Sequence, residues 1–315
     1  DNANKNQKIN VCKFDTKVFE NIYDDTIDAF DNPITDSVIF SLNHLMKEVS
    51  KKVKVAFSGE GADEIFGGYY HFSIINYIEH IKKFSISKNL GNFLTLVPHS
   101  LINLFFQYQG KLGLTGKKRF TECLKSNFET NNDFEDLISV FSRNEIKNLL
   151  TPDYKSKIDN DRKEFSKKNL ILDNFSKWLP NYTLYKTDQL SMHNGLEVRV
   201  PYLNNDFYNI FFEIINFKKG KLYKDKKILI DYINAKSKIK INKKIALQNY
   251  LDNENKILFI KMIDGKINKN SAIFNLIDHK NFEIIKEDYK SRPELILEKQ
   301  LSTLLILNSW LEKNA

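Results

Sequence analysis

Four glycines and three carboxylates fall within one short run of this chain, from Ser58 to Tyr69, with the sequence SGEGADEIFGGY. Glycine at this density loses backbone entropy on folding, so it is useful only where the main chain turns sharply or lets another molecule approach closely. The run therefore predicts a ligand-binding loop. An ordinary strand-to-helix turn with solvated acids is the alternative that composition alone leaves open.

The loop follows a short segment, 53–57, whose alternating and β-branched residues predict a strand. Open α/β sheets bind ligands at the carboxyl ends of their strands, beside the amino termini of the following helices. Three carboxylates would repel bare phosphate, whereas a magnesium ion prefers carboxylate and phosphate oxygens together. The sequence thus predicts a magnesium-nucleotide site in which one carboxylate is left to move protons.

The loop resembles the signature of the asparagine synthetase family, the glutamine-dependent enzymes that use ATP to make an amide from a carboxylate. Of its twelve positions only Ile65 departs from the family pattern, which has leucine there. Two further segments resemble family elements in the same order. They are 31–37 (DNPITDS), which is similar to an Asp-Glu-Pro-x-x-Asp-x-Ser turn, and 188–203 (DQLSMHNGLEVRVPYL), which is similar to an Asp-Arg-x-Ser-Met-x-x-Ser-Leu-Glu-x-Arg-x-Pro-Phe-Leu stretch. The resemblance spans roughly residues 20 to 250.

The resemblance implies a role for most residues of the loop. Glu60 matches the general base that takes a proton from the incoming ammonia. Ser58, Gly59 and Gly61 match positions whose backbone lies along the nucleotide. Asp63 matches a magnesium ligand that also neutralises the phosphates. ATP and Mg²⁺ are therefore the implied cofactors.

Other polar residues in the matching segments have two interpretations each. Glu64 is either a partner that supports the site or a cap for the following helix. Asp188, Glu197 and Arg199 either line the pocket for the acyl substrate or form a structural ion pair; we expect Arg199 to be partly buried and paired with one of the two acids. His193 is expected to be a tolerated loop residue.

A second catalytic candidate lies further along the chain. The family has a Lys-x-x-Leu-Arg element whose lysine stabilises negative charge growing on the acyl-adenylate. Lys226 aligns with that lysine, although Ile230 replaces the arginine, and a solvated lysine in a basic turn is the alternative. A later family element, Arg-Lys-Lys-x-Gly-Phe, is degraded to NKKIAL at 242–247, which leaves the amidated acid open.

The spacing of apolar residues predicts a helix from 36 or 37 to about 50 and another over 70–81, on either side of the strand and loop. From about residue 85 onward the spacing is mostly helical, and a mobile basic loop is expected near 110–118. We expect an α/β fold: a remnant of the parallel sheet of adenine-nucleotide alpha-hydrolase-like (PP-loop ATPase) proteins, followed by a mainly helical region. The expected domains are 1–84, the end of the nucleotide-binding core, and 85–315, the helical remainder.

Composition excludes several other classes of function. The net charge of +8 comes from 48 basic residues of which only five are arginine, the preferred base reader, so we expect no nucleic-acid partner. The chain shows no apolar run long enough for a membrane span and no signal peptide. Two cysteines in 315 residues favour a reducing, cytoplasmic location, and the six histidines show no metal-ligand spacing.

Two family elements are missing from the sequence: the Ser-Gly-Gly-x-Asp-Ser loop that grips pyrophosphate, and an amino-terminal cysteine that hydrolyses glutamine. We therefore expect the carboxy-terminal part of a glutamine-hydrolysing asparagine synthetase, a ligase that is inactive as a fragment and is a possible homodimer when intact. Its substrates would be aspartate or another carboxylate, and glutamine-derived ammonia. The alternatives are an amidotransferase acting on a sugar carboxylate in surface-polysaccharide biosynthesis, and a non-catalytic interaction protein that retains the fold.

Overall fold

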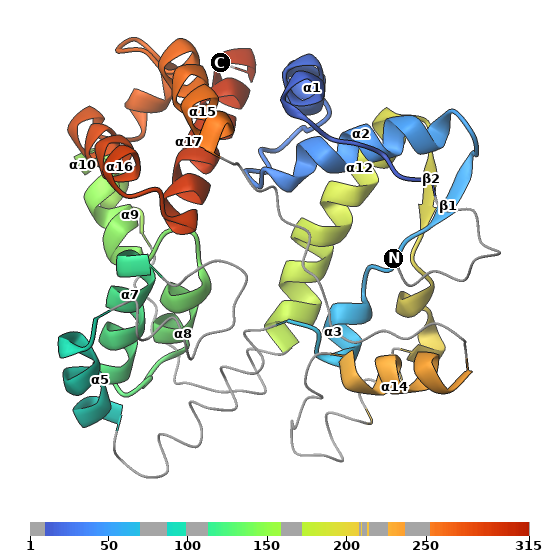
Figure 1. Ribbon diagram of the computed structural model, residues 1–315, viewed down its shortest axis with the longest axis horizontal. Helices are drawn as coiled ribbons and strands as arrows, with labels where there is room; N and C mark the ends of the chain where they lie inside the picture. Colours follow the sequence, from blue (N-terminus) through green and yellow to red (C-terminus); the bar gives the residue numbers. More distant parts are fainter. Residues whose placement is uncertain are drawn as a thin grey trace. The chain divides into compact units, whose positions relative to one another are not determined.

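The computed structural model describes residues 10–69, 87–98, 113–158, 172–207, 209, 213, 226–236 and 253–314. Most of this part of the chain is helical, and its sheet has two parallel strands (Figure 1). The helices are α1 (Thr16–Asp28), α2 (Val38–Ser50), α3 (Ala62–Phe66), α5 (Ser87–Leu96), α7 (Gly113–Lys125), α8 (Asn131–Ile138), α9 (Arg143–Leu149), α10 (Pro152–Lys155), η1 (Asn174–Leu184), α12 (Tyr185–His193), η2 (Pro201–Leu203), α14 (Lys227–Lys236), α15 (Asn253–Lys266), η4 (Ala272–Asn275), α16 (His279–Ser291) and α17 (Leu295–Asn314), and the strands are β1 (Val55–Phe57) and β2 (Glu197–Arg199). None of these helices combines the length and the apolar character that crossing a membrane requires.

The chain forms two compact units that interleave along the sequence. Unit 1 comprises 1–30, 38–77 and 167–248, and unit 2 comprises 31–37, 78–166 and 249–315. The sequence predicted two domains separated by one boundary near residue 84, whereas these units cross between the two halves of the chain. The domain boundary therefore stays a prediction.

The two strands of unit 1 bring together segments that are far apart in sequence. β1 pairs in parallel with β2, and Val55, Ala56 and Phe57 lie opposite Glu197, Val198 and Arg199. Figure 1 shows the two strands side by side. The pairing continues beyond the strands, because the Ser58 N–H donates to the Arg199 carbonyl over 2.8 Å. The loop of residues 58–69, the glycine-acid loop, therefore meets the 188–203 segment at the carboxyl end of the sheet.

An aromatic cluster fixes α1 against α2 in unit 1. The rings of Tyr23 and Phe40 stack with centroids 4.9 Å apart, and Phe19 packs edge-on against Phe40 at 4.8 Å. Tyr23 and Phe40 are almost fully buried, as is Ile39 of α2. Burying each such side chain contributes about 1.5–3 kcal/mol, so the apolar face of α2 is a main source of stability for this pair. The Asp15 carboxylate caps α1 by accepting the Val18 N–H at 2.9 Å.

Unit 2 is helical in its described residues and has a core of its own. α7 packs against α5 and α8, and α17 packs against α15 and α16. Leu301 and Leu304 of α17 and Ile263 of α15 are buried in this core. A buried guanidinium, that of Arg119 on α7, donates to the carbonyls of Ser139 and Val140 and to the Glu145 carboxylate.

The structure bears out several predicted elements and changes others. The strand appears as β1, two residues shorter than predicted, and the helix ending near 50 appears as α2. The basic loop near 110–118 is wrong in part, because α7 begins at Gly113 and includes Lys117 and Lys118. The predicted helix over 70–81 lies outside the described residues. The fold is thus mostly helical with a two-stranded parallel sheet, as expected in outline.

Candidate active site

The glycine-acid loop turns directly from β1 into α3. Gly61 stands at the amino-terminal cap of α3 with φ +85°, a left-handed conformation that side chains disfavour. A Cβ there would also overlap the side chain of Leu203. Gly59 has no such constraint, because a Cβ there would meet nothing within 4 Å. Gly61 is therefore required by the turn, whereas Gly59 leaves open space beside the main chain.

Glu60 lies between these glycines, and its two carboxylate oxygens have different surroundings. Oε1 accepts a hydrogen bond from the Thr187 hydroxyl of α12. Oε2 is buried and has no hydrogen-bond partner in the part of the chain that is described. Burial raises the pKa of Glu60, while the Thr187 hydrogen bond and the positive charge of Lys186 oppose that rise and the negative charge of Glu64 adds to it. A carboxylate with one desolvated, unengaged oxygen is well suited to accept a proton.

Glu64 lies inside α3 and is buried. Its Oε1 accepts a hydrogen bond from the Tyr69 hydroxyl at 2.5 Å. Burial raises the pKa of Glu64, and the Tyr69 hydrogen bond lowers it. Burial and the nearby Glu64 carboxylate in turn raise the pKa of Tyr69. Glu64 is thus held in a buried acid-phenol pair within the loop.

Asp63 faces the second catalytic candidate, Lys226. The Lys226 ammonium lies 3.1 Å from Asp63 Oδ1, and both side chains are mostly buried. A side chain at Gly68 would overlap both of them, so this glycine allows the pair to form. Lys226 itself has φ +56°, which is uncommon for a residue other than glycine. The structure therefore brings Lys226 to the loop although 162 residues separate it from Asp63.

The remaining predicted residues lie on the outside of β2 and α12. Arg199 Nε donates to Glu197 Oε1 at 2.7 Å, and the two side chains are 58% and 56% exposed. The expected pairing with Glu197 is present, but the expected burial of Arg199 is wrong. The reason is the alternation of β2, which places both residues on one exposed face of the strand. Asp188 is also exposed.

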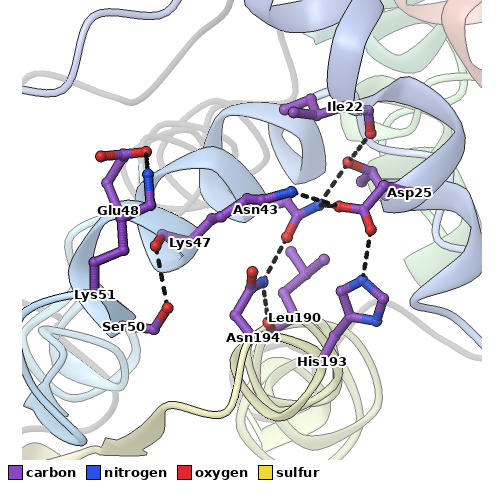
Figure 2. A network of polar contacts seen from close by, with 11 residues as sticks. Ile22, Asp25, Asn43, Lys47, Glu48, Ser50, Lys51, Leu190, His193 and Asn194 are labelled. Carbon is purple, nitrogen blue, oxygen red and sulfur yellow. Dashed lines mark hydrogen bonds and ion pairs between the residues drawn. The ribbon is translucent and has the colours of Figure 1, made fainter.

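Sequence reasoning missed the polar network that holds the far end of α12 (Figure 2). His193 Nε2 lies 3.0 Å from Asp25 Oδ1 of α1, so His193 is more than the tolerated loop residue that was expected. The Asn194 amide donates to Asn43 Oδ1 of α2 at 2.6 Å, and the Asn43 amide donates to Asp25 Oδ2 at 3.2 Å and to Thr26. These interactions tie α12 to α1 and α2. The hydrogen bonds to His193 and Asn43 lower the pKa of Asp25, although burial opposes this.

The helix that carries Thr187 begins in an unusual way. η1 is wound as a π-helix, contains Pro180 and runs without a break into α12. The Tyr185 N–H donates to the carbonyls of both Pro180 and Tyr182. The Lys186 ammonium lies over the Tyr182 ring, 4.8 Å from its centroid. The start of α12 is therefore fixed just where Lys186 and Thr187 face Glu60, and π-helical turns are often found at functional sites.

A known protein family matches almost the whole chain. The family pattern described as asparagine synthase matches residues 8–312. The chain belongs to the asparagine synthase family. The match extends beyond the span of roughly 20 to 250 seen in the sequence motifs, so α15, α16 and most of α17 are part of the family domain.

Individual members of the family are distant relatives of this chain. It is 25% identical over 271 residues to asparagine synthetase [glutamine-hydrolyzing] 1 of Bacillus subtilis (strain 168), a match that covers 79% of this chain and 40% of that protein. It is 26% identical over 184 residues to putative asparagine synthetases [glutamine-hydrolyzing] of Mycobacterium bovis and Mycobacterium tuberculosis, covering 57% of this chain and 27% of those proteins. The chain therefore spans less than half the length of these curated relatives.

The loop fits a nucleotide better than it fits a metal held by protein alone. The open space beside Gly59 leaves room for a ligand along the main chain. No group of three or more metal-ligating side chains occurs within the described ranges. Magnesium usually takes only one or two carboxylates and completes its shell with phosphates and water, so one carboxylate of the loop would suffice. Asp63 is such a carboxylate, and its Oδ1 pairs with Lys226 in this structure.

Proposed function

We propose that this member of the asparagine synthase family supplies the base and part of the ATP site of an enzyme that converts aspartate to asparagine. ATP would adenylate the side-chain carboxylate of aspartate, and glutamine-derived ammonia would then displace AMP. The observation that carries the proposal is Glu60, a half-buried residue that follows β1: one carboxylate oxygen is held by Thr187, and the other is buried and unengaged among the described residues.

Glu60 would take the proton that ammonia must lose when it bonds to the acyl carbon. The nitrogen forms a bond to that carbon, the bond from carbon to the AMP oxygen breaks, and the electron pair leaves with AMP. Glu60 is suited to this step because burial raises its pKa and makes the carboxylate a stronger base than it is in water. Burial also keeps water away from the oxygen that would receive the proton.

The nucleotide would lie along the backbone of Ser58, Gly59 and Gly61, where open space adjoins Gly59. Asp63 would hold a magnesium ion, which neutralises phosphate charge when it is bound. Lys226, paired with Asp63 in this structure, would stabilise negative charge on the acyl-adenylate. The left-handed backbone of Lys226 supports a functional role, because such conformations cluster at active sites.

We assign the aspartate side of the site to Glu64, Asp188, Glu197 and Arg199. Glu64 would support the loop from inside through Tyr69. Asp188 and the Glu197–Arg199 pair are exposed, so they are accessible to a polar substrate. These residues do not discriminate between carboxylic acids, so a sugar carboxylate is the second candidate acceptor. The replacement of the family arginine by Ile230 also leaves the identity of the amidated acid open.

The test uses the full-length natural protein with ATP, Mg²⁺ and ammonium, so that it does not depend on glutamine hydrolysis. Asparagine is measured by mass spectrometry, with uronic acids as competing substrates in parallel reactions. We expect asparagine from the wild type, none above background from Glu60→Gln, and wild-type rates from Glu48→Gln, an exposed carboxylate on α2. Amide formed only from a uronic acid would replace aspartate as the substrate. An absence of magnesium-ATP binding would instead support the non-catalytic alternative.

A further inference from the structure

The two carboxylate oxygens of Glu60 have different surroundings, and the difference comes from one side chain, that of Thr187. The Thr187 hydroxyl donates to Oε1, while Oε2 stays buried and unpartnered among the described residues. Thr187 is itself buried, on the face of α12 that meets the loop. A glutamate carboxylate rotates about χ3 through a broad, roughly two-fold profile, so an unrestrained Glu60 would present either oxygen.

We propose that Thr187 is a positioning residue: its hydroxyl holds Oε1 of Glu60 so that Oε2 is the oxygen that accepts the proton from ammonia. This inference rests on the proposed function of the same site. The proton that leaves nitrogen forms the new bond to Oε2, and the hydrogen bond from Thr187 to Oε1 stays in place throughout. Thr187 touches no substrate atom in this account and acts through Glu60 alone.

A neutral donor suits this task better than a charged one. Among the described residues, the charged groups that act on Glu60 are Lys186 on α12 and Glu64 on α3, and they act on it in opposite directions. Lys186 favours the carboxylate form, whereas Glu64 and burial favour the protonated form. A second cation in place of Thr187 would stabilise the carboxylate further and weaken it as a base. The threonine hydroxyl fixes the orientation of the carboxylate without adding charge.

The helix that carries Thr187 is anchored firmly enough to position a catalytic group. At its carboxyl end, His193 contacts Asp25 and the Asn194 amide donates to Asn43 (Figure 2). At its amino end, α12 is continuous with η1. A supporting side chain needs such a rigid base, because a loosely held one leaves the catalytic geometry imprecise.

The matched variants are Thr187→Val, which keeps the shape and removes the donor, Thr187→Ser, which restores the hydroxyl, and Ser191→Ala. Ser191 is the control because it is buried on the same helix and, within the described part of the chain, its hydroxyl bonds to the Asp188 carbonyl, at 3.1 Å, and not to Glu60. Circular dichroism of each full-length variant verifies that it is folded.

The first readout is independent of activity. Infrared difference spectra of the full-length protein with ¹³C-labelled glutamate follow the carboxyl band of Glu60 with pH, and Glu60→Gln assigns that band. Losing the hydrogen bond that stabilises the carboxylate should shift the Glu60 titration to higher pH in Thr187→Val, and Thr187→Ser should restore it. Ser191→Ala should titrate as the wild type does. An unshifted titration in Thr187→Val would overturn the proposal.

The second readout is the rate of amide formation. Thr187→Val should lower kcat by roughly ten- to a hundred-fold, a part of the 10²–10⁴ that a positioned base contributes, with little change in the KM for aspartate. Thr187→Ser should recover most of the rate. An unchanged kcat in Thr187→Val would refute the positioning role. If the Glu60 titration shifts in Thr187→Val but the wild-type protein forms no amide, the contact between Thr187 and Glu60 is supported and the proposed function is overturned instead.

Discussion

Two glycines of the loop should respond in opposite ways to the same substitution. Gly61→Ala puts a side chain at φ +85°, and the left-handed region costs about 1–2 kcal/mol for such a residue. The new Cβ also overlaps Leu203, whose side chain must leave its rotamer at about 0.5–1.5 kcal/mol. Restricting the unfolded chain returns about 0.4–1 kcal/mol. We therefore expect Gly61→Ala to lower the free energy of unfolding of unit 1 by about 0.5–3 kcal/mol.

Gly59→Ala is the matched control, because its Cβ would enter open space and its backbone is not left-handed. The gain through the unfolded chain should leave Gly59→Ala unchanged or stabilised by up to about 1 kcal/mol. If a nucleotide lies along this backbone, however, the same methyl group should weaken ATP binding. Gly59 would then be explained by the ligand and Gly61 by the fold.

The assay is urea-dependent hydrogen exchange read by mass spectrometry on peptides that cover β1 and α12, which reports unit 1 separately from unit 2. Calorimetry of ATP binding to the same variants supplies the second measurement. The reasoning fails if Gly61→Ala is as stable as the wild type, or if Gly59→Ala destabilises unit 1 as much as Gly61→Ala does. Unchanged ATP affinity in Gly59→Ala would contradict the placement of the nucleotide.

Three further predictions concern unit 2. Burial raises the pKa of Glu298 to about 7, above its ordinary 4.5, so the contribution of Glu298 to stability is complete below pH 4.5 and is lost as the pH rises through 7. We expect the free energy of unfolding to fall by up to about 3 kcal/mol over that range. In urea titrations, Glu298→Gln should abolish this pH dependence. Arg119→Met should cost about 3–5 kcal/mol in the same titrations, because it removes a buried guanidinium that donates to two part-buried carbonyls and a carboxylate. Arg143→Met, at a more exposed ion pair, should cost less than about 1 kcal/mol; equal costs would contradict this. Burial raises the pKa of the Cys123 thiol to about 12, so maleimide should label Cys123 at pH 8 only after unfolding, and rapid labelling of the native protein would refute its burial.

The sequence predicted the loop well because its constraints are local. The strand and the glycine turn follow one another within 55–61, and each has a signal in its own residues, whereas the short helix α3 inside the loop was not predicted. The left-handed turn at residue 61 requires a glycine, whatever residues surround it. Parallel pairing with 197–199 was not predicted, although both segments carried family motifs, because strand pairing depends on contacts across some 140 residues of chain.

The surroundings of Glu60 could not be predicted from local pattern. Lys186 and Thr187 are polar positions with no apolar period to mark them as buried, and they are buried only because α12 packs beside the loop. The network of Asp25, Asn43 and His193 is hidden for the same reason, since its members lie on three helices. The exposure of Arg199 was mispredicted because its valine neighbours suggested burial, while strand alternation turned its own side chain outward.

The transfer of oxygen from substrate to AMP tests the central claim most directly. Full-length protein is given aspartate labelled with ¹⁸O in its side-chain carboxylate, together with ATP, Mg²⁺ and ammonium, and the AMP is analysed by mass spectrometry. If the carboxylate is adenylated and ammonia then displaces AMP, one ¹⁸O atom appears in AMP for each asparagine formed. Glu60→Gln should still release pyrophosphate but form no asparagine. Asparagine that accompanies unlabelled AMP, or full synthesis by Glu60→Gln, would contradict the account.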